Sequence, residues 1–419
     1  MKKIAIVGAG QAGLQLGFEL LSHGCEVTLY TDRSSQQVLN GPTGPIAIQF
    51  HPRTVIEQQL GLDFWSTYEG ARIDTTVMKL FSPDGEKVLQ AGAMLSSPAQ
   101  AIDLRLKYAT WLMEFPRRGG SVVVGPADLA LLERAAATHD AVFVTTGNDT
   151  FQELFPRDPE RSELDRPYRH LTLFFAKNCV MDPDIDPAIH VNGLNSIVGV
   201  GECLFYNFLD RDLSKTWVLL FEGVPGGPLD LLGHGGSVRA QFEQVRRYLK
   251  DACPQVHAMI ASAELIEHET MLGAITPTVR RAAGRLPSGK VAMALGDALI
   301  SYDPMTAQGL NAASRIAHHV AQAILAAPDA VFDAHWIDAV FRDYWKTARH
   351  GFHLTRDFVT QLQPHQQLAL YAASLIPEIA SDVFDNAGEM EKIYAWFGDA
   401  EATMAYLKGK GFTPQPAAA

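Results

Sequence analysis

Apolar and polar residues at the start of the chain follow the pattern of a β-α-β unit. The apolar run 4–7 is typical of a buried strand, and it ends in a turn that contains Gly8, Gly10 and Gly13. Apolar residues then recur at helical spacing over 14–21, and a second strand-like run follows at 26–30. The pattern therefore predicts a strand, an amphipathic helix and a second strand in that order.

The three glycines of this turn have different tasks. Gly8 makes the tight turn, Gly10 lets the backbone approach a phosphate, and Gly13 lets the helix pack close to the strand. Gln11 and Ala12 lie among the first amides of the helix, where a pyrophosphate binds. Strand, turn and helix together predict dinucleotide binding.

Further strands and helices are expected up to residue 147. Residues 38–55 are rich in glycine and proline and predict an irregular loop over the cofactor face. The other expected elements are a hairpin at 74–90 with its turn at 82–85, helices at 103–115 and 127–138, and strands at 122–124 and 141–147.

The sequence pattern changes between about 165 and 265, where short runs of residues that favour β-strands are separated by Gly, Pro and Asp. These runs lie at 171–175, 197–200, 204–206 and 217–221. They predict an antiparallel sheet inserted into the nucleotide-binding fold. A buried strand is expected again at 291–295, and almost the whole chain from Gln308 onward has helical periodicity.

Composition narrows the class of protein. The chain has 419 residues and a formal net charge of −12, which argues against nucleic-acid binding. No apolar run is long enough to span a bilayer. Four cysteines lie far apart, which is typical of a reducing cytoplasm. No metal-ligand set, catalytic triad or pair of carboxylates emerges from the sequence.

Two more strand-end elements accompany the first glycine turn. One is Thr145-Thr146-Gly147, whose threonines could also simply satisfy the strand-end backbone, and the other is Gly296-Asp297. An Asp at the carboxyl end of a strand can accept a hydrogen bond from a ribityl hydroxyl. A helix start follows at 303–311, containing Pro304, Gln308, Gly309 and Asn311, and its amides suit an anionic flavin edge or a phosphate.

These three elements in this order resemble the flavoprotein monooxygenases of the p-hydroxybenzoate-hydroxylase fold. Their second helix start usually reads Gly-Gln-Gly, and here Ala307 replaces the first glycine. The run Tyr30-Thr31-Asp32-Arg33 departs from the usual Glu and resembles one branch, the oxygenase component of styrene monooxygenase and its indole-oxidising relatives. Further stretches resemble the same branch at 101–106, 201–203, 296–297 and 383–386.

The resemblance implies an α/β fold: a Rossmann-like FAD-binding domain, an inserted antiparallel β-sheet substrate domain and a helical C-terminal region. We expect the FAD-binding domain at 1–70, 100–165 and 266–345, the substrate domain at 71–99 and 166–265, and the helical region at 346–410. The residues expected to bind FAD are Gly8, Gly10, Gln11, Ala12, Gly13, Thr31, Asp32, Arg33, Arg105, Thr146, Gly147, Gly296, Asp297, Pro304, Gln308, Gly309 and Asn311.

Some of these residues have a plain structural alternative. Arg105 could be an ordinary helical arginine, and Thr31-Asp32 could be a simple turn. His51 lies on the variable loop and is a candidate substrate contact, although most of the 14 histidines must face solvent. Phe205, with Tyr206 and Phe208, could line an apolar substrate pocket or pack in the core.

The resemblance also implies the chemistry. Reduced FAD reacts with O2 to give a C4a-hydroperoxide, which epoxidises styrene- or indole-like aromatic alkenes, so no catalytic acid or base is expected. Only one full G-x-G-x-x-G is present, and the family implies that a separate NADH-dependent flavin reductase supplies reduced FAD. The family also suggests a homodimer. The alternatives are a single-component NAD(P)H-dependent aromatic hydroxylase and a non-enzymatic flavin-binding redox sensor.

Overall fold

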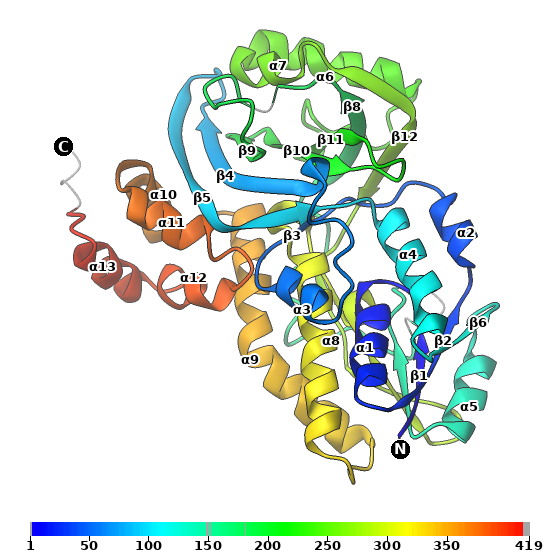
Figure 1. Cartoon of the computed structure of the whole chain (residues 1–419). Coiled ribbons are helices and arrows are strands. Elements are labelled where there is room, and N and C mark those ends of the chain that lie inside the picture. Colours follow the sequence, from blue (N-terminus) through cyan, green and yellow to red (C-terminus); the bar gives the residue numbers. More distant parts are fainter. Residues whose placement is uncertain (1, 148–150, 152, 181, 414–419) are drawn as a thin grey trace. The chain divides into compact units, whose positions relative to one another are not determined.

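The computed structural model describes residues 2–147, 151, 153–180 and 182–413, and they fall into two compact units (Figure 1). Unit 1 comprises Met1–Trp65, Ile102–Pro167 and Ile275–Arg349. Unit 2 comprises Ser66–Ala101, Tyr168–Ala274 and His350–Ala419. The helices after His350 thus group with the sheet of unit 2, whereas the sequence suggested a region of their own. The assignment of the units to cofactor and substrate stays a prediction.

Unit 1 contains a largely parallel sheet with the strand order β14-β15-β7-β1-β2-β6. The strands β1, β2, β6, β7 and β15 run parallel, and β14 pairs antiparallel with β15. Ile4, Ala5, Ile6 and Val7 are completely buried, as a central parallel strand requires. The strands are β1 (Lys3–Val7), β2 (Glu26–Thr31), β6 (Ser121–Val124), β7 (Ala141–Val144), β14 (Ala283–Arg285) and β15 (Val291–Ala294).

The helices of unit 1 begin where the sequence provides a cap. Asp103 accepts a hydrogen bond from the Arg105 amide at the start of α4, and Asp128 accepts one from Leu131 at the start of α5. The helices are α1 (Gln11–Ser22), α2 (Ser35–Leu39), α3 (Arg53–Gln59), α4 (Leu104–Arg117), α5 (Leu129–Thr138), α8 (Gln308–Ala326) and the first part of α9 (Ala334–Val359). Short elements are β3 (Ile48–Gln49), β13 (Thr278–Val279), β16 (Ile300–Ser301), η3 (Gly296–Ala298) and η4 (Pro304–Thr306).

The segment 38–55 differs from the irregular loop predicted for it. It contains the end of α2, the strand β3 and the start of α3. Ser34 caps α2 through a capping box with Gln37, a local signal that the glycines and prolines nearby obscured.

Unit 2 contains a sheet in which the strands follow the order β12-β8-β11-β10-β9-β4-β5. The strands are β4 (Arg72–Phe81), β5 (Lys87–Ala101), β8 (His170–Lys177), β9 (Val191–Ile197), β10 (Gly201–Leu209), β11 (Lys215–Gly223) and β12 (Glu264–Ala274). The predicted hairpin at 74–90 is confirmed as β4 and β5.

Two details of this sheet were predicted wrongly. The sheet is mixed, because β4 pairs parallel with β9, whereas a purely antiparallel sheet was expected. The strand expected at 197–200 ends at Ile197, because the chain turns at Gly199 with a φ of +76° before β10 begins.

The core of unit 2 lies between the sheet and the helices α6 (Val238–Ala252) and α7 (Pro254–Ile260) (Figure 1). Phe174, Phe205, Phe221 and Phe242 meet there with edge-to-face rings. Since side chains alternate along a strand, Tyr206 lies on the opposite face of β10 from Phe205.

The C-terminal helices bury a second cluster against β4 and β5. They are α10 (Pro364–Leu375), α11 (Pro377–Phe384), α12 (Met390–Phe397) and α13 (Ala400–Gly409), and the short helix η1 (Glu69–Ala71) precedes β4. Met78 and Leu89 of the sheet pack in one cluster with Leu370 and Ile379 of the helices. Within the described part of the chain, no helix has the length and apolarity needed to cross a membrane.

Phe205 provides a test of this core. Its side chain is 0% exposed, and we expect Phe205→Ala to lower the free energy of unfolding by about 3–5 kcal/mol, because a large cavity would remain. Phe64, which is 40% exposed, is the matched control, and Phe64→Ala should cost about 1 kcal/mol or less. Urea denaturation measures both, and equal costs would contradict the described packing.

Candidate functional site

The glycine turn after β1 has the geometry that its sequence predicts. Gly8 has a φ of +117°, and a Cβ placed there would lie 2.5 Å from Thr145 Oγ1. A Cβ at Gly13 would lie only 2.1 Å from the carbonyl oxygen of Gly8. At Gly10, by contrast, a Cβ would meet nothing within 4 Å. Two glycines therefore allow close packing, and Gly10 leaves open space beside the first turn of α1.

The structure brings the three strand-end elements together. Thr145 Oγ1 donates to the Gly8 carbonyl at 3.0 Å. A Cβ on Gly147 would lie 3.0 Å from Asp297 Cβ, and one on Gly296 would lie 3.3 Å from Ala12 Cβ. Segments that are more than 130 residues apart in sequence thus meet at the carboxyl ends of β1, β7 and β15. Ligands of open α/β sheets bind at such an edge.

The pKa values of two ionisable groups at this edge, Asp297 and Tyr108, are raised. Asp297 is accessible to solvent, yet the protein around it desolvates its carboxyl enough to raise the pKa. Burial raises the pKa of the Tyr108 hydroxyl, and the charges of Asp297 and Glu57 raise it further, against a hydrogen bond from the Gln11 amide. Tyr108 was expected only as an apolar position of the helix at 103–115.

The end of β2 presents an accessible carboxylate. Thr31 is buried, and its Oγ1 accepts from the Arg33 amide at 3.3 Å and donates to the Arg33 carbonyl at 3.2 Å. The Asp32 side chain is 68% exposed and lies 3.5 Å from Arg33 Nε. Thr31 therefore stabilises the turn. The Asp32 carboxylate is exposed to solvent and could accept a hydrogen bond from a ribose hydroxyl. Binding by Thr31, Asp32 and Arg33 stays a prediction.

The second helix start is shaped by a left-handed residue. Pro304 begins η4, Ala307 has a φ of +54°, and Gln308 begins α8, where its Nε2 donates to the Thr306 carbonyl at 2.9 Å. A Cβ at Gly309 would meet nothing within 4 Å, so this turn, like that at Gly10, is open on one side.

Asn311 has a clear structural task. Its Nδ2 donates to the carbonyls of Ile48 and Ala307 at 2.8 and 2.7 Å, and its Oδ1 accepts from the Phe50 amide at 3.0 Å. The side chain is buried and holds the 48–50 segment against the start of α8. This role was not visible in the sequence, and cofactor binding by Asn311 stays a prediction.

Other predicted residues have different surroundings. Arg105 is buried, and its guanidinium pairs with Asp103, with Nη2 2.6 Å from Oδ2. Thr146 and Gly147 lie just after the end of β7, with the Thr146 amide 3.0 Å from the position of a Cβ on Gly8. His51 is exposed and precedes α3, and its contact with substrate stays a prediction.

Phe205 points into the core of unit 2. This supports the alternative that Phe205 packs in the core and does not contact substrate.

A buried polar cluster beside the glycine turn was missed by sequence reasoning. Glu57 Oε1 accepts from Gln11 Nε2, Gln49 Nε2 and Lys107 Nζ. Burial lowers the pKa of Lys107, although the charges of Glu57 and Asp63 oppose this. The available signal was a lysine among the apolar positions of α4, but nothing in the sequence identifies its partners. In the residues that the structure describes, no group of three or more His, Cys, Asp or Glu could hold a metal ion.

The two open glycine positions generate a prediction about binding. We expect Gly10→Ala to fold normally and to weaken dinucleotide binding by about tenfold or more, because its methyl group enters the space beside the helix amides. Gly13→Ala should instead lose at least about 2 kcal/mol of stability through the clash with the Gly8 carbonyl. FAD titration and urea denaturation separate the two effects, and a destabilised Gly10→Ala variant would contradict the assignment.

Ala307 generates a prediction about backbone strain. The left-handed conformation costs a non-glycine residue about 1–2 kcal/mol, and glycine avoids this cost. Glycine also makes the unfolded chain more flexible, which lowers the stability of the folded protein by about 0.4–1 kcal/mol and offsets part of the benefit. We therefore expect Ala307→Gly to stabilise the protein by up to about 1 kcal/mol. The control Ala323→Gly, within α8, should destabilise it by about 1 kcal/mol. Urea denaturation of both variants checks the opposite signs.

Comparisons with known proteins identify several proteins to which the chain is similar. A family model described as "Styrene monooxygenase A putative substrate binding domain" matches residues 147–258. The chain is 26% identical over 417 residues to styrene monooxygenase StyA of Pseudomonas fluorescens, covering 96% of each chain. StyA of a Pseudomonas species matches with the same identity and coverage.

Solved structures show the fold. A triple mutant of the flavin-dependent brominase Bmp2 superposes with a TM-score of 0.70 at 13% identity, covering 98% of this chain and 100% of that one. The p-nitrophenol 4-monooxygenase PnpA from Pseudomonas putida DLL-E4 superposes with a TM-score of 0.58 at 12% identity, covering 98% of each chain. The predicted fold class is thereby confirmed. The predicted resemblance is confirmed as well, and the comparisons support a flavin-dependent monooxygenase that is similar along nearly its whole length to styrene monooxygenase StyA.

Proposed function

We propose that the chain is a monooxygenase that uses reduced FAD and O2 to epoxidise styrene- or indole-like aromatic alkenes. The observation that carries this proposal is the convergence of Gly8–Gly13, Thr145–Gly147 and Gly296-Asp297 at one sheet edge, in a chain similar to StyA over 96% of its length. When bound there, reduced flavin would supply the oxygen-transfer chemistry. The protein's task is then to bind, orient and exclude water.

Several features of unit 1 favour FAD as the dinucleotide. The open position at Gly10 suits a pyrophosphate, the exposed Asp32 suits the adenosine ribose, and Asp297 suits a ribityl hydroxyl. A second open helix start at Gly309 suits the edge of a flavin ring, for which a nicotinamide dinucleotide has no need.

The substrate contacts are inferred to lie partly in unit 2. The family match at 147–258 includes β8 to β11, and every residue of β10 is buried, with aromatic side chains on both faces of the strand. Since Phe205 belongs to the core beneath α6 and α7, the opposite face of β10, with Tyr206 and Phe208, is the better candidate for an apolar substrate surface. A dry apolar surface protects a reactive oxygen donor from water.

The single dinucleotide motif favours an external source of electrons, although a single-component hydroxylase can bind NAD(P)H without a second motif. Only one G-x-G-x-x-G is present in the sequence, and nothing comparable marks a separate NAD(P)H domain. We infer that an NADH-dependent flavin reductase supplies FAD already reduced, as the resemblance to styrene monooxygenases implies. The protein would then need to bind reduced FAD from solution.

This proposal predicts a specific dependence on cofactor. The purified chain should convert styrene to its epoxide, or oxidise indole, when supplied with reduced FAD and oxygen, and product analysis measures this. It should not oxidise NADH on its own. The Gly10→Ala variant is the control, because it should fold and yet lose product formation at limiting FAD. Rapid NADH oxidation by the chain alone would indicate a single-component hydroxylase instead.

A further inference from the structure

A row of buried polar side chains follows one face of α1 in unit 1. Gln11, Gln15 and Glu19 are four residues apart, so they lie one above another on the helix. All three are buried, and Gln15 is 0% exposed. Buried polar groups cost stability unless they are hydrogen-bonded. The role of this row therefore depends on its partners.

Two of these side chains link α1 directly to α8. Gln15 Nε2 donates to the Ser314 carbonyl at 3.0 Å. One turn further along both helices, Glu19 Oε2 lies 2.8 Å from His318 Nδ1. The second link lies four residues after the first on each helix, so the two helices run in the same direction. Both helices therefore begin at the same end.

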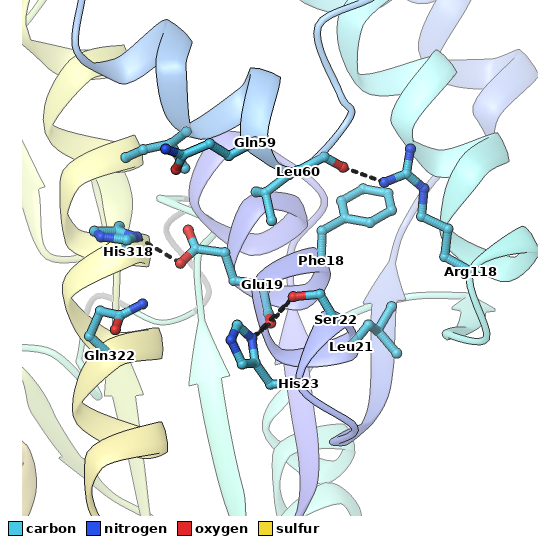
Figure 2. A pocket seen from close by; sticks show the side chains of 11 residues that line it. Phe18, Glu19, Leu21, Ser22, His23, Gln59, Leu60, Arg118, His318 and Gln322 are labelled. Atoms are coloured by element: carbon cyan, nitrogen blue, oxygen red, sulfur yellow. Dashed lines mark hydrogen bonds and ion pairs between the residues drawn. The ribbon is translucent and has the colours of Figure 1, made fainter.

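The two links differ in their access to solvent. Figure 2 shows the outer link at the wall of a pocket, with the Glu19 carboxylate pointing toward His318. The His318 side chain is 41% exposed, whereas the inner link at Gln15 is completely buried. Gln322, one turn beyond His318 on α8, lines the same pocket. It belongs to neither link and is therefore a suitable control position.

The direction of these hydrogen bonds is fixed. A carbonyl only accepts, so Gln15 must turn its NH2 group toward Ser314. The same Nε2 donates to Glu19 Oε1 at 2.8 Å, and Gln15 Oε1 accepts from Gln11 Nε2 at 3.0 Å. Gln11 Nε2 also donates to Glu57 Oε1 at 2.9 Å. One network thus joins the first residue of α1 to both links.

Links of this kind can set the register of two helices. Apolar contacts have no direction, so one can replace another when helices slide. Two hydrogen-bonded links are both satisfied in one register, and a slip by one helical turn, about 5.4 Å, would lose both. The buried groups would then be left unpaired, which is costly. A single buried polar residue fixes the register of coiled coils for the same reason.

We propose that Gln15 and Glu19 are positioning residues that set the register of α1 against α8. The first residue of α1 lies four positions before Gln15, about 6 Å along the helix axis. The first residue of α8 lies six positions before Ser314, about 9 Å along its axis. The links are thus close enough to both helix starts to fix the spacing between them.

This spacing matters for a ligand that contacts both helix starts. Gly10 precedes α1, Gly309 lies in the first turn of α8, and both positions have open space beside them. Under the proposed function, on which this assignment rests, the pyrophosphate of FAD binds at the first start and the flavin edge at the second. ADP has the same pyrophosphate and no flavin, so its binding should not depend on the spacing.

Titrations with FAD and ADP test the register. Gln15→Met keeps an unbranched side chain and removes its hydrogen bonds to Ser314, Glu19 and Gln11. We expect this variant to raise the Kd of oxidised FAD by about fivefold or more and that of ADP by less than about twofold. A loss of affinity for FAD that is no greater than the loss for ADP would overturn the proposal.

Glu19 provides a test by conservative replacement. Glu19→Met removes the outer link and should raise the Kd of FAD by about threefold or more. Glu19→Gln keeps an acceptor for Gln15 and a donor for His318, so its Kd should stay within about twofold of the parent. The control Gln322→Met should leave both Kd values unchanged. If Glu19→Met binds FAD like the parent, or Glu19→Gln binds it as weakly as Glu19→Met, the role assigned to Glu19 is wrong.

Hydrogen exchange of the ligand-free protein separates this proposal from the proposed function. Gln15→Met should speed exchange in peptides of α1 and α8 by about threefold or more, and leave α5, which contains neither link, unchanged. Unchanged exchange in α1 and α8 would overturn the proposal. Failure of the parent to bind FAD would overturn the proposed function, and the exchange rates would still decide the register. If Gln15→Met does not fold, Glu19→Met replaces it in both measurements, because its lost partner His318 is partly exposed.

Discussion

The contact between Gly13 and the carbonyl of Gly8 sets how closely α1 can lie against β1. A Cβ at Gly13 would stand 2.1 Å from that oxygen, so only glycine allows this approach. The approach brings the first amides of α1 to the level where β7 and β15 end, and Thr145 fixes the arrangement by donating to the same carbonyl. The segments 145–147 and 296–297 of the candidate site are positioned with respect to this turn.

Residues near one another in sequence were the predictable part of the structure. The strand of residues 4–7, its glycine turn and the hairpin at 74–90 have short-range patterns, since side-chain periodicity and turn residues act over a few positions. The pairing of β4 with β9 was not predictable in this way. It is a parallel contact between segments more than 100 residues apart, and no local sequence pattern in either strand identifies the strand with which it pairs.

The same limit applies to single side chains of the site. Asn311 looked like a cofactor ligand because of its motif, yet its amide is engaged by the backbone of residues 48–50. Phe205 could have faced a pocket or the core, and only the register of β10 against α6 and α7 decides between them. Lys107 and Glu57 are about 50 residues apart, and their contact depends on how α3 and α4 pack.

The tether made by Asn311 has a consequence for how the sequence of residues 48–51 can change. Asn311 holds residues 48–50 through a carbonyl and an amide of the main chain, so the tether does not depend on which side chains those two residues carry. Mutations at His51 or at the side chains of Ile48 and Phe50 leave these two hydrogen bonds intact. The segment can therefore diversify, in evolution or in a designed library, while its backbone stays in register with the start of α8.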